Sequence, residues 1–572
     1  MSKRSKTTEP SPVQITQPEF NLTVEPWIGV VLKDGMMQEW GLIDLFTHLD
    51  DVAALRVESE LEDPAIFRML LAICYRALDP VLTEEWVNWW DEGSLPTDRI
   101  VRYLEDHKSD FWLFHPQRPF MQTLFDPKEG AGDPFNDLDI LVSEPIGTDV
   151  ESNRSEMSVR SMGYAEIARR LVEAQQYSKY GTLGSYQGAI DEIKSKVYAG
   201  PAYLGSVTLV RLVTGDLLRD MLLSLIPLDS GLFDFGDLPL EEATGLPFWE
   251  IGGIPLTGAG RKQSPLSTKT IEDTLTWASR RIRLYKMDDG TVKVLFRSGK
   301  HVYKQTKQTK QTKQKVNYLD NPGLESMVAF YDRKDKDTDE ITVCSWKAPS
   351  NKAFWRSLIS LTRGPGRIEP KTLQWASLLE KSGRLPASYV GSISTITPRY
   401  VSQGTKLTAI IKDAVSLPID VLEDTDAVDL IDAAITVSET MVWHYENFVR
   451  EVKIASGQDP IRAKSTASTE MFQVYDALGV RFAPWVSSLL DDDSEQNDWS
   501  DDNSLEEWID IVEKELKHLA ALQMRNATPA SLYGRDIKDK NGDVSGHYSS
   551  ADAENKLMAM MRSVRRKALG SK

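Results

Sequence analysis

The chain has 572 residues, and its 67 Lys and Arg residues against 85 Asp and Glu residues give a formal net charge of −18. Hydrophobic residues make up 41% and charged residues 27%, which is typical of a folded globular protein and excludes a collagen-like or wholly disordered chain. The length exceeds what one hydrophobic core organises, so we expect at least two domains. The acidic balance argues against a protein that coats nucleic acid non-specifically, but it leaves room for a local basic groove.

Two cysteines, Cys74 and Cys344, are too few for a disulfide scaffold or a four-thiolate zinc site, and they fit a reducing compartment. No stretch approaches the roughly 18 apolar residues that span a bilayer. Residues 1–19 lack the apolar segment of a signal peptide. We therefore expect a cytoplasmic protein with no membrane partner.

The N-terminal segment changes character near Phe20. Residues 1–19 are rich in Ser, Thr, Pro and Gln, which predicts a disordered tail. The following residues predict two short strands that are broken at Pro26 and closed by a turn at Asp34 and Gly35.

The next 400 residues predict a mixed architecture. Residues 64–79 begin with a proline and are apolar on most sides, which indicates a buried helix. Two β-type runs flank Asp289-Gly290, a pair typical of a hairpin turn. Strands, glycines and prolines otherwise mix without a βαβ rhythm, so we expect a large irregular α+β domain over residues 20–415.

The C-terminal region reads as helical. Amphipathic segments separated by polar loops lie at residues 424–456, 465–490, 504–525 and 551–569. Ser504 and Glu507 have the spacing of a capping box, and one apolar stripe follows. That stripe consists of Leu505, Trp508, Ile509, Val512, Leu516 and Leu519. The sequence therefore predicts a C-terminal four-helix bundle over residues 416–572.

Three segments have a strongly biased charge. Residues 300–315 carry six lysines, no acid and a repeated Gln-Thr-Lys triplet, whereas residues 491–507 carry nine acids and no base. The chain after Glu554 is again basic. Each segment is either a solvated surface or a contact surface, with DNA phosphate as the ligand of the basic segments and a protein partner for the acidic one.

No pattern in the sequence builds a catalytic site. The seven histidines form no HExxH motif and none lies at ligand spacing from a cysteine. Residues 258–262 lack the spacing of a phosphate-binding loop, and residues 391–395 are not a nucleophile elbow. We therefore expect no enzymatic activity, no metal and no cofactor.

Several short motifs nevertheless resemble one family. Pro26-Trp27-Ile28 and the run from Arg118 to Thr123 (Arg-Pro-Phe-Met-Gln-Thr) carry the resemblance at the N-terminal side. Further similar segments are 213–219 with Leu222-Leu223, 275–284, 354–358 and the terminal helical region. Their common order from about residue 20 to 565 resembles the large subunit, or CasA family, of the type I-E CRISPR surveillance complex Cascade.

This resemblance implies a non-catalytic subunit of an RNA-guided antiviral complex. Such a subunit recognises the protospacer-adjacent motif in double-stranded DNA, promotes duplex opening and R-loop formation, and helps recruit the helicase–nuclease. Its partners are the crRNA-containing Cascade subunits, the double-stranded target DNA and the recruited helicase–nuclease. The division of labour is physically reasonable, because base pairing reads the long target and the protein reads only a short motif.

Two DNA-contacting parts are implied by position. The family's glycine-rich loop falls on residues 194–201, where Lys196, Tyr198, Ala199 and Gly200 are the implied contacts. Ala199 stands where the family often has glycine, so motif specificity is expected to differ. An ordinary turn is the alternative interpretation of this segment. The family's duplex wedge falls on Ser402, Gln403 and Gly404, with Gln403 favoured; a simple hairpin turn is the alternative.

Two further parts are implied less directly. The basic finger falls on Arg281 and Arg283, which share one face of a predicted strand while Arg280 faces away; ion pairing with neighbouring acids is the alternative. The mobile loop of the family falls on residues 149–155, with Asn153 and Arg154 as the implied contacts. Some members bind zinc through a cysteine cluster, which this chain lacks.

A rival interpretation is a helical scaffold that docks protein partners without binding nucleic acid, and a hydrolase or nuclease with an unrecognised site is a third. The acidic charge suits the scaffold equally well. Co-purification separates the three, because only the first requires a crRNA and sister subunits.

Overall fold

The computed structural model describes most of the chain in segments. These are residues 11–124, 135–143, 162–178, 181–184, 196–199, 202–237, 239–240, 243–251, 270–298, 303–305, 317–319, 322–334, 339–349, 352–386, 389–400, 407–489, 502–538 and 543–570. The chain forms two compact units. Unit 1 comprises Met1–Ser350, Gly366–Leu378 and Ile393–Ala414, and unit 2 comprises Asn351–Pro365, Leu379–Ser392 and Val415–Lys572.

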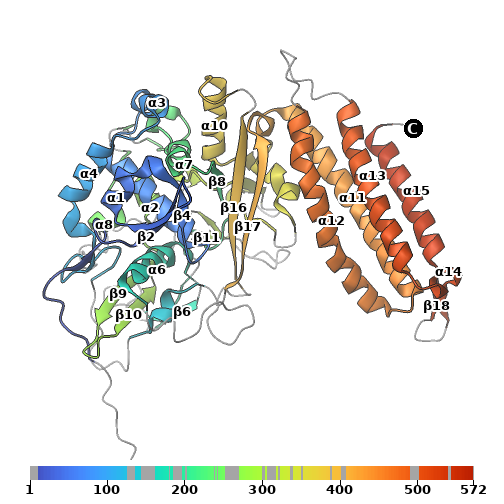
Figure 1. Ribbon diagram of the computed structural model, residues 1–572, viewed down its shortest axis with the longest axis horizontal. Helices are drawn as coiled ribbons and strands as arrows, with labels where there is room; N and C mark the ends of the chain where they lie inside the picture. The colour runs from blue at the N-terminus through green and yellow to red at the C-terminus, as the bar shows by residue number, and fades with distance from the viewer. Residues whose placement is uncertain are drawn as a thin grey trace, which may run out of the picture. The chain divides into compact units, whose positions relative to one another are not determined.

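Unit 1 contains short helices and many short strands (Figure 1). Its described α-helices are α1 (Leu42–Thr47), α2 (Glu62–Ala77), α3 (Thr83–Glu92), α4 (Thr97–Asp106), α6 (Tyr164–Tyr177), α7 (Leu217–Ser224), α8 (Phe248–Ile251), α9 (Ile271–Leu275) and most of α10 (Lys371–Lys381). Its strands up to residue 298 are β1 (Glu19–Asn21), β2 (Ile28–Leu32), β3 (Met37–Trp40), β4 (Val52–Arg56), β5 (Trp112–Phe114), β6 (Gly181–Gly184), β7 (Lys196–Ala199), β8 (Leu209–Val213), β9 (Arg280–Lys286) and β10 (Val292–Ser298). The later ones are β11 (Tyr303–Gln305), β12 (Asn317–Leu319), β13 (Phe330–Lys334), β14 (Ile341–Ser345), β15 (Arg367–Ile368), and the parts of β16 (Val390–Tyr400) and β17 (Leu407–Pro418) that fall in this unit.

The described strands form sheets of only two or three strands. The three-stranded sheets have the orders β3-β2-β4, β14-β13-β15 and β17-β16-β8, and the other strands of unit 1 pair two by two. Such small sheets interleaved with helices confirm the predicted irregular α+β class of the N-terminal region. The predicted hairpin at Asp289-Gly290 is confirmed as β9–β10, in which Lys286 lies opposite Val292. Gly290 adopts φ +84°, a conformation that glycine reaches without steric cost.

The core of unit 1 centres on α2, which packs against α6 and α9. The predicted apolar character of this helix is confirmed, since residues such as Phe67 and Leu70 are fully buried. Two charged residues of α2, Glu62 and Arg68, are buried with them. Glu62 pairs with Arg170 of α6, at 3.2 Å. Arg68 pairs with a carboxylate from a distant part of the sequence. Its guanidinium binds both carboxylate oxygens of Glu325, at 2.9 and 3.1 Å, and neither side chain is exposed.

Hydrogen-bonded structure begins earlier than the predicted start at Phe20. Pro12 forms an isolated antiparallel bridge with Met287, and the Val13 amide donates to the Lys286 carbonyl at 2.8 Å. Pro12 and Val13, which the composition predicts to lie in a disordered tail, are thus held against the backbone beside the end of β9. Residues 1–10 lie outside the described part of the chain.

Unit 2 is dominated by four long helices that run beside one another (Figure 1). They are α11 (Thr425–Ala455), α12 (Pro460–Ser488), α13 (Asp502–Asn526) and α15 (Ser550–Ala568), and α11 contacts the other three. The short α14 (Ala530–Tyr533) and the hairpin of β18 (Arg535–Lys538) and β19 (Val544–Tyr548) separate the last two long helices. The predicted helical bundle is confirmed, and the sequence interpretation missed the small hairpin inside it.

Two helix starts differ from their predictions. Helix α12 begins at Pro460 rather than at residue 465, because the Asp459 carboxylate accepts hydrogen bonds from the Ile461 and Arg462 amides. Helix α13 begins at Asp502, before Ser504, so the capping box predicted from Ser504 is wrong.

The apolar stripe of α13 is the centre of the bundle core. Trp508, Ile509, Val512 and Leu516 are fully buried, as predicted. The Trp508 indole N–H donates to the Ser438 hydroxyl of α11 at 2.9 Å, so its polar atom is satisfied inside the core. Trp355, from a segment far upstream in the sequence, also lies in this core, with its ring centre 6.2 Å from that of Trp508.

Candidate nucleic-acid interface

The β9–β10 hairpin carries the predicted basic finger. Arg281 is only 6% exposed, and its guanidinium carbon lies 6.0 Å from the centre of the Phe248 ring. Arg283 is partly exposed, and its guanidinium carbon lies 5.0 Å from the centre of the Tyr285 ring. Arg283 is therefore the better placed of the two to reach a ligand, whereas the burial of Arg281 favours a packing role. Contact of either residue with DNA stays a prediction.

The segment expected to form the glycine-rich loop is in part a strand. Residues Lys196–Ala199 form β7, which pairs antiparallel with β6 so that Tyr198 lies opposite Thr182 and Ala199 opposite Gly181. Gly200 lies just outside the described residues. Both β6 and β7 contact β10, so the structure brings this hairpin beside the hairpin that carries Arg283. Two parts that the sequence could only place 80 residues apart are thus neighbours in unit 1.

The wedge residues Ser402, Gln403 and Gly404 lie outside the described part of the chain, between β16 and β17. The two strands are neighbours in one sheet. The Thr395 hydroxyl donates to the Asp413 carbonyl at 3.2 Å, and the Thr408 hydroxyl donates to the Arg399 carbonyl at 3.0 Å. These reversed pairings show that the strands run antiparallel, so residues 401–406 join the arms of a hairpin.

The end of β16 that leads into this connection lies beside cations that the sequence interpretation overlooked. Arg399 and Tyr400 end β16, and Lys347 follows β14. The Lys347 ammonium donates to the Gly205 carbonyl at 3.3 Å and lies 6.0 Å from the centre of the Tyr400 ring. The Tyr400 hydroxyl donates to the Tyr177 carbonyl. Burial, and then the neighbouring Arg399 charge, lower the pKa of Lys347 to about 8. The position of Arg399 four residues before Gln403 was the available signal.

Two other predicted elements fall largely outside the described residues. Asn153 and Arg154 of the predicted mobile loop belong to this group. Of the lysine-rich segment, Tyr303–Gln305 forms β11, which pairs with β12 (Asn317–Leu319). These two strands pair antiparallel, and residues 306–316 between them lie outside the described part of the chain.

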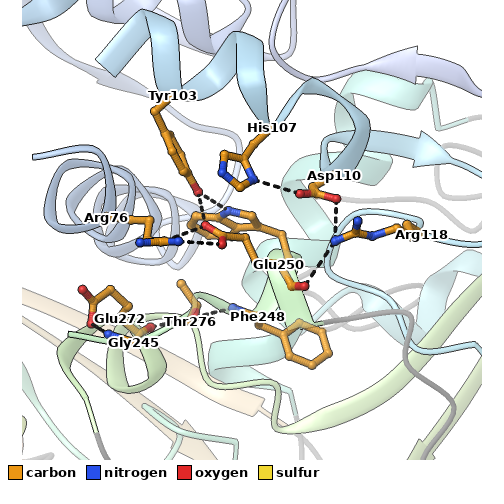
Figure 2. A network of polar contacts seen from close by, with 11 residues as sticks. Arg76, Tyr103, His107, Asp110, Arg118, Gly245, Phe248, Glu250, Glu272 and Thr276 are labelled. Atoms are coloured by element: carbon orange, nitrogen blue, oxygen red, sulfur yellow. Dashed lines mark hydrogen bonds and ion pairs between the residues drawn. The ribbon is translucent and has the colours of Figure 1, made fainter. Parts of the chain in front are cut away.

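One polar network of unit 1 surrounds Glu250 (Figure 2). The Glu250 carboxylate accepts hydrogen bonds from the Arg76 guanidinium, at 2.9 and 3.2 Å, and from the Tyr103 hydroxyl, at 2.8 Å. The Tyr103 hydroxyl in turn accepts from the Trp249 indole N–H at 2.8 Å. Burial and the adjacent carboxylate raise the pKa of Tyr103 well above its usual range, so this hydroxyl remains a neutral donor. The network fastens α8 to α2 and α4.

The Arg118–Thr123 motif belongs to the same region. The Arg118 guanidinium pairs with the Asp110 carboxylate at 2.8 Å and donates to the Glu250 carbonyl at 3.2 Å (Figure 2). The Phe120 ring is fully buried and stacks on Phe111, with 5.3 Å between the ring centres. Both observations show that this motif packs and forms ion pairs in unit 1.

Figure 2 also shows Glu272, a buried carboxylate with a raised pKa. Glu272 is 1% exposed and accepts a hydrogen bond from the Gly245 amide at 3.1 Å. Burial raises the pKa of Glu272 to about 7. Among the residues that the structure describes, no group of three or more His, Cys, Asp or Glu side chains is arranged to hold a metal ion. The described helices also include none that is long and apolar enough to cross a membrane.

Comparison with known proteins decides the family. A sequence profile described as CRISPR-associated protein Cse1 matches residues 21–520. The chain belongs to the Cse1 family. This membership confirms the resemblance to the large subunit of the type I-E Cascade and the mixed fold with a C-terminal helical region.

Individual Cse1 relatives agree with the match. CRISPR-associated protein CasA/Cse1 of Thermus thermophilus is 26% identical over 475 residues, which cover 82% of this chain and 85% of that protein. The crystal structure of Thermobifida fusca Cse1 superimposes with a TM-score of 0.75 at 23% identity, covering 97% of this chain and 99% of that one. A chain of a CRISPR RNA-guided surveillance complex superimposes with a TM-score of 0.57 at 14% identity, covering 89% of this chain and 100% of that chain.

Proposed function

We propose that this protein is the non-catalytic subunit of an RNA-guided DNA-surveillance complex that recognises the protospacer-adjacent motif in duplex DNA. In this role it promotes duplex opening and R-loop formation and helps recruit the helicase–nuclease. Its partners are the crRNA-bearing sister subunits and the target DNA. Membership of the Cse1 family supports the proposal, and so does the similarity of the fold to a chain of a surveillance complex.

The observation that carries the DNA-recognition part is the proximity of two predicted contact segments in unit 1. The β6–β7 hairpin, which leads to Gly200, contacts the hairpin that bears the partly exposed Arg283. A backbone segment with small residues and an adjacent cation suit the minor groove, where base edges offer a degenerate set of acceptors and phosphates flank the groove.

Duplex opening is assigned to Gln403 at the connection between β16 and β17. A glutamine amide is compact and offers both a donor and an acceptor, so it replaces hydrogen bonds of a displaced base pair. Replacing Gln403 with Ala in the assembled complex is expected to reduce R-loop formation while crRNA content stays normal. Gln473, an exposed glutamine of α12, provides the matched control, since its replacement with Ala removes the same group elsewhere.

The test is reconstitution of the complex with crRNA and sister subunits, followed by binding to motif-bearing and motif-free duplexes. Loss of discrimination between the two duplexes when this chain is omitted supports the proposal. Stable association of the chain with protein partners but with no crRNA or DNA would instead favour the helical scaffold. Metal-dependent cleavage of plasmid by the purified chain, absent from a mock preparation, would contradict the non-catalytic role.

A further inference from the structure

The cations beside the end of β16, Lys347 and Arg399, lack a carboxylate partner within the described residues. The Nε and Nη2 atoms of Arg399 are buried and have no hydrogen-bond partner in that part of the chain. The Lys347 ammonium has only the Gly205 carbonyl and the face of the Tyr400 ring. Both residues are partly exposed.

Several arginines of unit 1 that are more deeply buried pair with carboxylates of the chain itself. Arg68 pairs with Glu325, and Arg170 pairs with Glu62 and Glu173, at distances between 2.7 and 3.2 Å. A carboxylate therefore accompanies these deeply buried guanidinium groups.

Lys347 instead lies close enough to Arg399 for the two positive charges to repel, and burial lowers the pKa of both groups. A partly buried charge without a counter-ion destabilises a fold, so the presence of two such charges in one place indicates a partner from outside the chain. That partner is an anion.

The surroundings indicate which anion. Arg399 and Tyr400 lead directly into residues 401–406, the predicted wedge, and the Gly205 carbonyl that binds Lys347 lies five residues after Gly200. Arg399 therefore lies close in sequence to one segment assigned to the DNA, and Lys347 is bonded to a residue close in sequence to the other. A planar guanidinium beside an ammonium is a favourable arrangement for a phosphate group.

We propose that Lys347 and Arg399 bind a backbone phosphate of the duplex DNA beside the point where it is opened. This inference rests on the proposed function and adds a phosphate-anchoring site to it. The contact holds the duplex through its backbone and reads no base, so it acts on every DNA sequence alike.

The variants Lys347→Gln and Arg399→Gln, singly and together in the full chain, test the site. We expect each protein to fold with a melting temperature equal to or above that of the wild type, because a like-charge repulsion is removed. In the assembled complex, affinity should fall about tenfold or more for motif-bearing and motif-free duplexes alike. The slope of log affinity against log salt should fall by about 0.9 for the one lost phosphate contact.

Controls separate the phosphate site from other roles of these residues. Lys412→Gln removes an exposed cation from β17 that pairs with Glu60. This control should change neither the affinity for duplex DNA nor the salt slope. The conservative Arg399→Lys should retain part of the affinity, because the charge remains and the planar fork is lost. The crRNA content should stay normal in every variant.

Several results would overturn the inference. A marked loss of melting temperature would mean that the cations have a stabilising partner within the chain. Unchanged affinity and salt slope in folded variants would remove the site while leaving the proposed function intact. A loss confined to motif-bearing DNA would indicate base reading, and a loss of crRNA would assign the site to guide phosphates. Failure of the wild-type complex to bind duplex DNA would contradict the proposed function itself.

Discussion

The buried Arg68–Glu325 ion pair contributes to the stability of unit 1, and its replacement tests that contribution. It joins α2 to the segment before β13 across 257 positions of sequence, through hydrogen bonds of 2.9 and 3.1 Å. Each side chain is held a second time, since Arg68 also donates to the Thr274 carbonyl at 3.0 Å and Glu325 accepts from the Met327 amide at 2.9 Å. Burial alone would raise the pKa of Glu325, but the Arg68 charge and these hydrogen bonds hold it below its usual value.

Replacing Glu325 with Gln leaves the Arg68 charge in the core without a counter-ion. Removing one partner of a buried pair typically costs about 3–5 kcal/mol, so protection of α2 amides against hydrogen exchange should fall roughly a hundredfold or more. Exchange resolved by peptide is the suitable assay, because it reports on α2 separately from unit 2. The double variant Arg68→Met with Glu325→Leu should recover much of the protection, since it removes both charges.

An exposed ion pair of the same unit supplies the control. Lys412 and Glu60 are each about half exposed, so Glu60→Gln should cost under about 1 kcal/mol and leave α2 protection nearly unchanged. Protection that changes no more in Glu325→Gln than in this control would refute the assigned role of the buried pair. A double variant less protected than Glu325→Gln would refute the charge-based explanation as well.

Three further predictions follow from the described contacts and the sequence. Because the folded-state pKa of Glu272 is raised to about 7, the carboxylate destabilises the fold progressively as pH rises from about 4.5 through 7. Glu272→Gln should therefore raise the melting temperature at pH 8, since it removes a penalty of up to about 3 kcal/mol. The same substitution should change the melting temperature little at pH 4. Trp508→Phe should cost about 1 kcal/mol or more in denaturant unfolding of unit 2, because the buried Ser438 hydroxyl loses its indole partner. Deletion of residues 305–314 should preserve folding and motif preference but weaken binding to all duplexes, most at low salt. An equal effect of Glu272→Gln at both pH values, full stability of Trp508→Phe, or a deletion whose loss is confined to motif-bearing DNA would contradict the respective argument.

Sequence patterns predicted the elements whose information is local. The turn at Asp289-Gly290 and the apolar period around Trp508 each depend on neighbouring residues, and both are found as expected. The start of α12 was placed five residues late because Asp459 and Pro460 were assigned to a loop, although a capping aspartate before proline is a local helix signal.

Features that depend on distant residues were not accessible from the sequence. Strand alternation placed Arg281 and Arg283 on one face, but it could not show that Arg281 becomes buried beside Phe248. The approach of Lys347 to Arg399 brings together a residue that follows β14 and a residue of β16, two strands that belong to different sheets. A single sequence contains no periodic signal for such a contact, because only tertiary packing creates it.

The central claim is tested most directly by one binding measurement on the assembled complex. The affinity for a motif-bearing duplex and for the same duplex without the motif is determined with the wild-type chain, with the chain omitted, and with Arg283→Ala and Gly200→Val combined. We expect clear preference for the motif with the wild-type chain and loss of that preference in both other samples, with crRNA still bound. Equal preference in all three samples would contradict motif recognition by this subunit.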